Sequence, residues 1–461
     1  MNEEEKIGYR QIFRQKEYMK TVIAAVINRF GDSIDSIAFT WLVYQITQSA
    51  AWSAIIFGVN RIPTILLQPF AGAAIEGKNK KRIMILTDLI RGFCVGFVAT
   101  GFLCGFLNQW ILLFASVLIS CAEAFRGPAS QSLLPKLLDK KYYALGLSLN
   151  SSACNVMELI GLGMAGAIIS IFSVSTAIYI DMITFFLSAL IILTVRVHEN
   201  KIEQEKVNIT GYIDTLRGGF NYLKNNAILK YFILLAVFLN AILVPFNSLQ
   251  APLITEVLKV NEIMLSILGI SITLGMIIGA AIYPHFSNRL SKRFIASLGS
   301  YSIGIFYLVL VLTGRFITSE ILIYSIIAIS ALLQGVGVAT LTTFFNVEFM
   351  KNVKEDYIAR VSAIFSACAV SAIPITSFVI SFLAKFTPTV VIFLIAAIAD
   401  ISISILLCSK KRLNSIEHNA KENHTKMTNS EKISLEKTNT VKINTMEDNM
   451  DGKEITDITN A

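Results

Sequence analysis

Residues 72–82 read GAAIEGKNKKR; they end an apolar run over 51–75 and lead into a second one over 83–106. Each run is long enough to cross a bilayer as a helix, which takes about 20 mainly apolar residues because the backbone must satisfy its own hydrogen bonds in hydrocarbon. The short basic segment between them is typical of a loop on the cytoplasmic side of a membrane. This stretch therefore predicts two spanning helices and the side on which they connect.

The composition of the chain excludes a water-soluble fold. Of its 461 residues, 54% are apolar and 16% are charged, whereas soluble domains carry roughly 25% charged residues. The formal net charge is +8, but the basic residues form short clusters beside apolar runs, which indicates membrane topology and no nucleic-acid partner. The six cysteines lie within or at the ends of apolar runs and include no CxxC pair, so we expect no metal site and no cofactor.

The same pattern along the chain predicts an all-α membrane protein with about twelve spanning helices in two halves. The expected spans lie near residues 20–46, 51–75, 83–106, 110–133, 145–171 and 174–197, and then near 228–256, 263–286, 294–313, 319–345, 361–385 and 388–409. The expected organisation is an N-terminal segment 1–19, a six-helix half 20–197, a linker 198–227, a second six-helix half 228–409 and a tail 410–461. We expect the tail to be disordered, because it is polar and lacks an apolar period.

Lys and Arg are concentrated in one set of loops, and this sets the predicted orientation. Basic clusters lie near residues 78–82, 136–141, 289–293 and 351–360. The loops on the opposite side are short and hold only scattered cations. Because Lys and Arg gather on the cytoplasmic side, we expect the basic loops, the linker and both termini to be cytoplasmic.

A short repeat connects the two halves. The tetrapeptide GAAI ends the second expected span at residues 72–75, before a basic loop, and it ends the eighth at residues 279–282, before another basic loop. With matching topology, this indicates a structural repeat of the kind found in transporters that rock two halves about a central site.

The loop after Gly72 resembles the signature of the major facilitator superfamily between its second and third helices. That signature is a Gly, three small or apolar residues, an acid and a basic cluster; here the acid is Glu76, and Gly77 stands where an Arg is usual. In the second half Tyr283 occupies the place of the acid. The resemblance implies the major facilitator fold and a cytoplasmic gate that comprises Gly72, Glu76, Lys80, Lys81, Arg82, Asp88 and Arg91.

Further matches resemble the drug-efflux branch of this superfamily, which includes macrolide efflux proteins and the enterobactin exporter. They comprise Gly31-Asp32, residues 41–49, Pro63, residues 88–91, residues 127–129, Leu134-Pro135 and Asn150. The antiporter motif of the fifth helix is partial, because Leu162 stands where a Pro is usual. The resemblance implies proton-coupled export of an amphipathic, macrolide-like compound across a bacterial cell membrane.

Charged residues inside the expected spans are candidates for coupling or substrate contact, because burying one costs about 2.5–3.5 kcal/mol on insertion scales. In the first span Arg29, Asp32 and Asp35 are spaced by three and share one face. We expect Arg29 and Asp32 to pair, which leaves Asp35 for a proton, a cationic substrate or a further arginine such as Arg61. The alternative is an ion-pair network that only holds helices together.

Two other sites in the first half carry charges. Glu123 and Arg126 form a second i, i+3 pair, which we interpret as a gate or a structural pair near the cytoplasmic end. Glu158 has no charged neighbour in its own span, so it either carries a proton or neutralises Arg29 or Arg61.

The remaining polar residues divide between the two halves. Asp181 lies nearer the outer end of the sixth span, where we expect it to be solvated. The second half has almost no charge within its spans. Its expected contribution is a set of amide side chains that hydrogen-bond a substrate: Asn240, Asn247, Gln250 and Gln334.

These features favour a secondary-active transporter, which we expect to act as a monomer. Its expected partners are a small amphipathic substrate, protons and the lipid bilayer. Export of a siderophore or other natural product and import of a nutrient remain alternatives on the same fold. A membrane-embedded enzyme is disfavoured because the chain has no HExxH or GxGD pattern, and an ATP-driven pump because it has no GxxxxGK[ST] loop. A receptor that binds a ligand without moving it is a further alternative.

Overall fold

The computed structural model describes residues 9–75, 78–138, 142–197, 223–224, 226–287, 292–353 and 358–407. Glu76, Gly77, most of the linker and the tail 410–461 therefore lie outside the described residues. Within them, the helices of the first half are α1 (Tyr9–Phe13), α2 (Lys16–Thr47), α3 (Ala50–Ile75), α4 (Lys80–Leu103), α5 (Gln109–Leu137), α6 (Tyr143–Ile171) and α7 (Val174–Leu193). Those of the second half are α9 (Ala227–Ser248), α10 (Gln250–Pro252), the π-helix η2 (Leu253–Leu258), α11 (Ile263–Ser287), α12 (Lys292–Phe316), α13 (Glu320–Asn352), α14 (Ile358–Leu383) and α15 (Thr389–Leu407).

Ten of these helices are long and apolar enough to cross a membrane: α3 to α7, α9 and α11 to α14. Helix α2 is not among them, because its interior charges lower its hydropathy, and the apolar stretch of α15, Thr389–Ile405, is shorter. Many large apolar side chains are exposed on the outside of the bundle; Phe93 is 67% and Ile321 is 78% exposed. An apolar exterior of this kind suits contact with lipid acyl chains.

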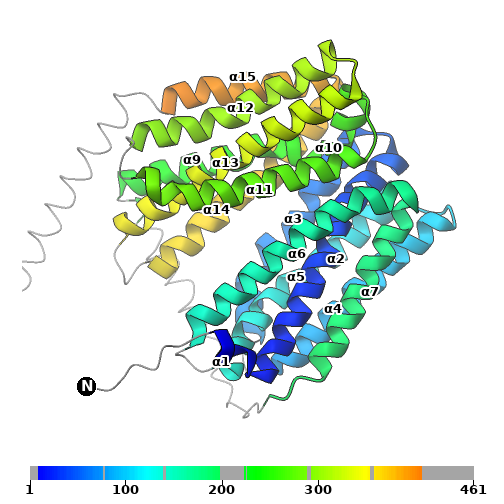
Figure 1. Cartoon of the computed structure of the whole chain (residues 1–461), viewed down its shortest axis with the longest axis vertical. Coiled ribbons are helices and arrows are strands. Elements are labelled where there is room, and N and C mark those ends of the chain that lie inside the picture. Colours follow the sequence, from blue (N-terminus) through cyan, green and yellow to red (C-terminus); the bar gives the residue numbers. More distant parts are fainter. Residues whose placement is uncertain are drawn as a thin grey trace, which may run out of the picture.

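The helices form two bundles, one built from α2 to α7 and the other from α9 and α11 to α15 (Figure 1). In the first bundle α2 packs on α6 and α7, and α4 packs on α5 and α7. In the second, α13 packs on α11 and α12, and α15 packs on α12. Helices α11 and α13 approach closely at Gly275 and Gly335: a Cβ at Gly275 would lie 2.1 Å from the carbonyl oxygen of Leu332, and one at Gly335 would lie 2.2 Å from that of Ile272. Small residues allow such close backbone packing between membrane helices.

The two bundles meet toward the end that carries the short, weakly basic loops. Helix α3 packs on α14, α6 packs on α11, and α10 contacts α2. The backbone N–H of Gly166 donates to Ser266 Oγ at 2.6 Å across this junction. A Cβ at Gly58 would lie 2.5 Å from Ser377 Cβ, so a glycine is needed there for α3 to reach α14.

The structure divides the span expected at 228–256. Helix α9 ends at Ser248, Leu249 leaves the helical region with φ −115° and ψ 23°, and the chain continues through α10 into η2. Pro245 and Pro252 bracket this break, and neither can donate the backbone hydrogen bond that a continuous helix requires. The break places η2 at the junction of the two bundles, next to the end of α2.

Candidate coupling and substrate site

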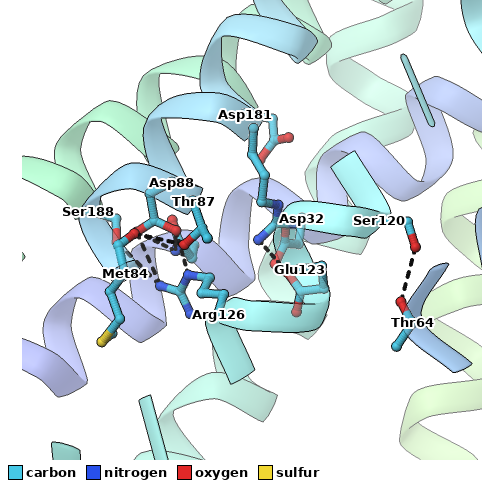
Figure 2. A network of polar contacts seen from close by, with 12 residues as sticks. Asp32, Thr64, Met84, Thr87, Asp88, Ser120, Glu123, Arg126, Asp181 and Ser188 are labelled. Carbon is cyan, nitrogen blue, oxygen red and sulfur yellow. Dashed lines mark hydrogen bonds and ion pairs between the residues drawn. The ribbon is translucent and has the colours of Figure 1, made fainter. Parts of the chain in front are cut away.

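Arg91 of α4 is the centre of a buried polar network in the first bundle. Its guanidinium pairs with Asp32 of α2 and with Glu123 of α5, each at 2.7 Å. The Arg91 side chain is only 9% exposed, and it also lies over the ring of Phe185 at 4.2 Å from the ring centroid. Figure 2 shows Asp32 and Glu123 close together at this site. Arg91 therefore connects α4 with both α2 and α5.

A second ion pair lies one turn away, at Asp88 of α4. Arg126 of α5 donates from Nε to one Asp88 oxygen, and Ser188 of α7 donates to the other at 2.7 Å (Figure 2). Asn28 of α2 lies at 3.5 Å from both carboxylate oxygens. Asp88 is 0% exposed, so this pair is shielded from solvent.

Two more acids lie beside Arg91. Asp35 of α2 interacts electrostatically with Asp32 and Arg91, and its Oδ1 atom is buried without a hydrogen-bond partner among the described residues. Asp181 of α7 is 1% exposed, accepts a hydrogen bond from Thr184 and interacts with the same groups. The site thus brings Asp32, Asp35, Asp181 and Glu123 around one arginine, an excess of acidic groups.

The position of Asp181 corrects the sequence-based expectation. We expected it to be solvated near the outer end of its helix, but it is buried against α2. Gly31 is the reason, because a Cβ there would lie 2.4 Å from Asp181 Oδ1. The contact could not be read from local sequence, since Gly31 and Asp181 belong to different helices.

The structure also pairs the charges differently from the helix-local pairs expected. Asp32 binds Arg91, while Arg29 faces Glu158 of α6 at 3.8 Å, with both side chains partly exposed. Glu123 and Arg126 do not pair with each other either, because their partners are on α4: Arg91 for Glu123 and Asp88 for Arg126. Residues three apart share a helix face, but their side chains diverge toward whichever neighbour offers the opposite charge.

Arg61 of α3 interacts electrostatically with Glu123. It is exposed, its guanidinium lies 5.6 Å from the ring centroid of Phe57, and it forms no ion pair with the described residues. It is therefore not the partner of Asp35 that we considered.

Three of the gate residues, Lys80, Lys81 and Arg82, lie in the first turn of α4. Lys81 donates to the carbonyl oxygens of Leu193 at 2.7 Å and Val195 at 2.8 Å, at the C-terminal end of α7. A cation suits that position because the last carbonyls of a helix carry partial negative charge. Asn79 caps α4 by accepting from the Arg82 backbone N–H. Gly72 lies in α3, and Lys80 is buried at the start of α4.

The amide residues of the second half do not converge on the charged site. Asn240 donates to the Ala236 carbonyl of its own helix at 2.9 Å, Asn247 is exposed and Gln250 is half-buried. Gln334 is buried with its Oε1 atom unpartnered among the described residues.

The sequence reasoning also missed an acid in the second half. Asp400 of α15 is 0% exposed and accepts from the Gly304 backbone N–H at 2.8 Å. The signal was available, because Asp400 is the one acid in the apolar run over 389–407. Gly304 lets α12 approach it, since a Cβ there would lie 2.8 Å from Asp400 Oδ2.

Apolar helices that enclose paired charges are typical of a multi-pass membrane protein with a functional site between its helices. The chain belongs to the family of transmembrane secretion effectors within the major facilitator superfamily, and the family profile matches residues 11–461.

Three relatives illustrate the similarity at the sequence level. The chain is 21% identical to macrolide efflux protein A of Enterococcus faecalis over 68% of this chain and 95% of that protein. It is 22% identical to the multidrug efflux pump Tap of Mycobacterium tuberculosis over 62% and 69%, and 24% identical to the staphyloferrin A transporter of Staphylococcus aureus over 60% and 68%. Against an uncharacterised transporter of Bacillus subtilis, the chain spans 65% of the relative's length.

Solved structures share the fold at lower identity. The nucleoside transporter NupG matches with a TM-score of 0.67 at 11% identity, over 85% of this chain and 98% of that one. A bacterial homologue of the iron transporter ferroportin matches with a TM-score of 0.65 at 16% identity, over 86% and 99%. The chain is thus a multi-pass protein of a bacterial membrane with the major facilitator fold.

Proposed function

We propose that this protein is a secondary-active exporter that moves an amphipathic, macrolide-like compound out of the cell in exchange for protons. It works as a monomer with twelve spanning helices, α2 and α15 included, and with both termini in the cytoplasm. Alternating access comes from rocking the two bundles against each other.

The observation that carries the proton coupling is the excess of acids around Arg91. Asp32 and Glu123 both bind this arginine, whereas Asp35 keeps one buried oxygen without a partner among the described residues. A buried carboxylate that lacks a cation is costly in its ionised form, so proton uptake relieves that cost. A cationic substrate in the same place would relieve it equally, which is the competition that an antiporter needs.

The direction of transport is supported by the relatives. Macrolide efflux protein A and the Tap pump are named as exporters of drugs, which favours an amphipathic compound moving outward. The similarity to the staphyloferrin A transporter supports a second candidate, export of a siderophore or another natural product.

The packing of the bundles supports alternating access. Contacts between the halves cluster toward the end with the short, weakly basic loops, where Gly166 binds Ser266 and α3 packs on α14. Closure at one end is one of the two arrangements that rocking requires.

The test is transport into proteoliposomes under an imposed pH gradient, with a panel of labelled macrolides, dyes and siderophores. We expect a macrolide-like compound to accumulate against its gradient and Asp35→Asn to lower the pH-driven rate at least about tenfold. The matched control is Glu17→Gln at the start of α2, where the side chain is partly exposed. Hydrogen bonds from the Lys20 side chain and from the Arg196 backbone N–H lower the pKa of Glu17, so it stays ionised and does not carry protons.

The outcomes separate the parts of the proposal. If no compound accumulates against its gradient, antiport is refuted. If transport occurs but Asp35→Asn and Glu17→Gln behave alike, Asp35 is a structural residue and the coupling group lies elsewhere.

A further inference from the structure

A small pocket lies at the junction of the two bundles, away from the Arg91 site. It has a volume of about 250 Å³ and is lined by residues of α2, of its C-cap and of η2: Trp41, Tyr44, Gln45, Gln48, Thr255 and Glu256. Its walls come from both halves of the chain. The pocket therefore has this shape only while the bundles are joined at this end.

Glu256 places an uncompensated negative charge in this pocket. Its Oε1 atom accepts a hydrogen bond from the Tyr44 hydroxyl of α2 at 2.8 Å, and its Oε2 atom accepts one from Thr389 of α15. Both donors are neutral, and no cation of the described residues forms an ion pair with Glu256. The side chain is exposed to solvent, so a cation from outside can reach it.

The local backbone explains why Glu256 faces α2. The break after Ser248 ends α9, and the chain then forms the wide turn of η2 before Lys259 adopts a left-handed conformation with φ 56°. A single π-helical turn of this kind is rare and is often found at functional sites. Thr255 uses its hydroxyl hydrogen on the Ala251 carbonyl at 2.9 Å, which leaves its oxygen as an acceptor.

The lining has the chemistry that recognises an organic ammonium group. Trp41 and Tyr44 line the pocket with aromatic rings, and aromatic rings attract cations through their quadrupoles. Glu256 supplies the opposite charge, and the amide oxygens of Gln45 and Gln48 can accept from an N–H group. An anion would be repelled by Glu256, and among the described residues no group of three His, Cys, Asp or Glu side chains gathers here to hold a metal ion.

We propose that this pocket binds a small organic ammonium ion, or the ammonium group of a larger compound, between Glu256 and the aromatic rings of α2. A ligand held by both halves binds the joined state better than a separated one, and so it stabilises closure at this end. The site is distinct from the Arg91 network, and the proposal does not depend on proton coupling or on the identity of the exported compound.

The experiment is a calorimetric titration of the purified full chain with choline, compared with 3,3-dimethylbutan-1-ol, its uncharged analogue of the same shape. We expect choline to bind and the alcohol to bind at least about tenfold more weakly, because cation–π and charge attraction supply the difference. Glu256→Gln keeps the acceptor for Tyr44 but removes the charge, and it should weaken choline binding at least about tenfold. The matched control Glu262→Gln removes a charge from the neighbouring loop and should leave the affinity unchanged.

Equal binding of choline and the alcohol by the wild-type chain would overturn the proposal, as would no binding of either. So would equal losses in Glu256→Gln and Glu262→Gln. The comparison of choline with the alcohol uses the wild-type chain, so it tests the proposal even if Glu256→Gln fails to fold. Transport under a pH gradient is measured separately, so its failure does not affect this result.

Discussion

Asp88→Asn removes the negative charge from the most enclosed ion pair of the first bundle while it preserves the size of the side chain. Asp88 is 0% exposed and receives hydrogen bonds from Arg126 and Ser188. The Arg126 side chain is 13% exposed, so in the variant its charge is left mostly buried without a carboxylate. Breaking a buried ion pair at one partner costs about 3–5 kcal/mol, because the remaining charge is uncompensated.

The exposed fraction of Arg126 allows some water to reach it, so we expect a loss near 3 kcal/mol, at the lower end of this range of about 3–5 kcal/mol. The measurement is the free energy of unfolding from SDS titration in mixed micelles, followed by circular dichroism. Glu123→Gln is the control: Glu123 is 47% exposed and Arg91 keeps Asp32, so its loss should stay below about 1 kcal/mol.

A second substitution tests whether the uncompensated charge of Arg126 causes the loss of stability. Combining Asp88→Asn with Arg126→Met also removes the buried positive charge of Arg126 and should recover part of the lost stability. A cost of Asp88→Asn no greater than that of Glu123→Gln, or a double variant less stable than Asp88→Asn alone, would contradict an uncompensated Arg126 charge as the cause.

Two further predictions concern the second bundle. Gly275→Ala places a Cβ 2.1 Å from a backbone carbonyl oxygen of α13, so it should destabilise the protein by about 1–3 kcal/mol in the same titration. Gly127→Ala, where a Cβ meets no atom within 4 Å, should not destabilise it, and a matching loss there would contradict the packing argument. Asp400→Asn should change stability by less than about 1 kcal/mol, because the amide oxygen still accepts from Gly304 and no cation of the described residues loses a partner. Asp400→Leu removes the carboxylate acceptor altogether and should cost about 1–3 kcal/mol; equal effects of the two variants would refute this account.

The positions of the helices could be predicted from the sequence because the bilayer imposes a local rule. A long apolar run has to satisfy its backbone hydrogen bonds within itself, so each span is encoded by its own residues. The structure departs from this rule at residues 249–258, where two prolines remove backbone donors and the chain follows a π-helical turn. Prolines mark such a place, but they do not specify the conformation that replaces the helix.

The sequence by itself determined that the first bundle holds charges inside its helices, that the chain spans a membrane many times and that it resembles major facilitator exporters. Only the tertiary structure decided which charges meet: Arg91 with Asp32 and Glu123, and Asp88 with Arg126. The physical reason is that partners on different helices are set by helix packing, and packing depends on distant small residues such as Gly31. The same packing brings Glu256 to the end of α2 across 212 residues of sequence, a contact that no local pattern encodes.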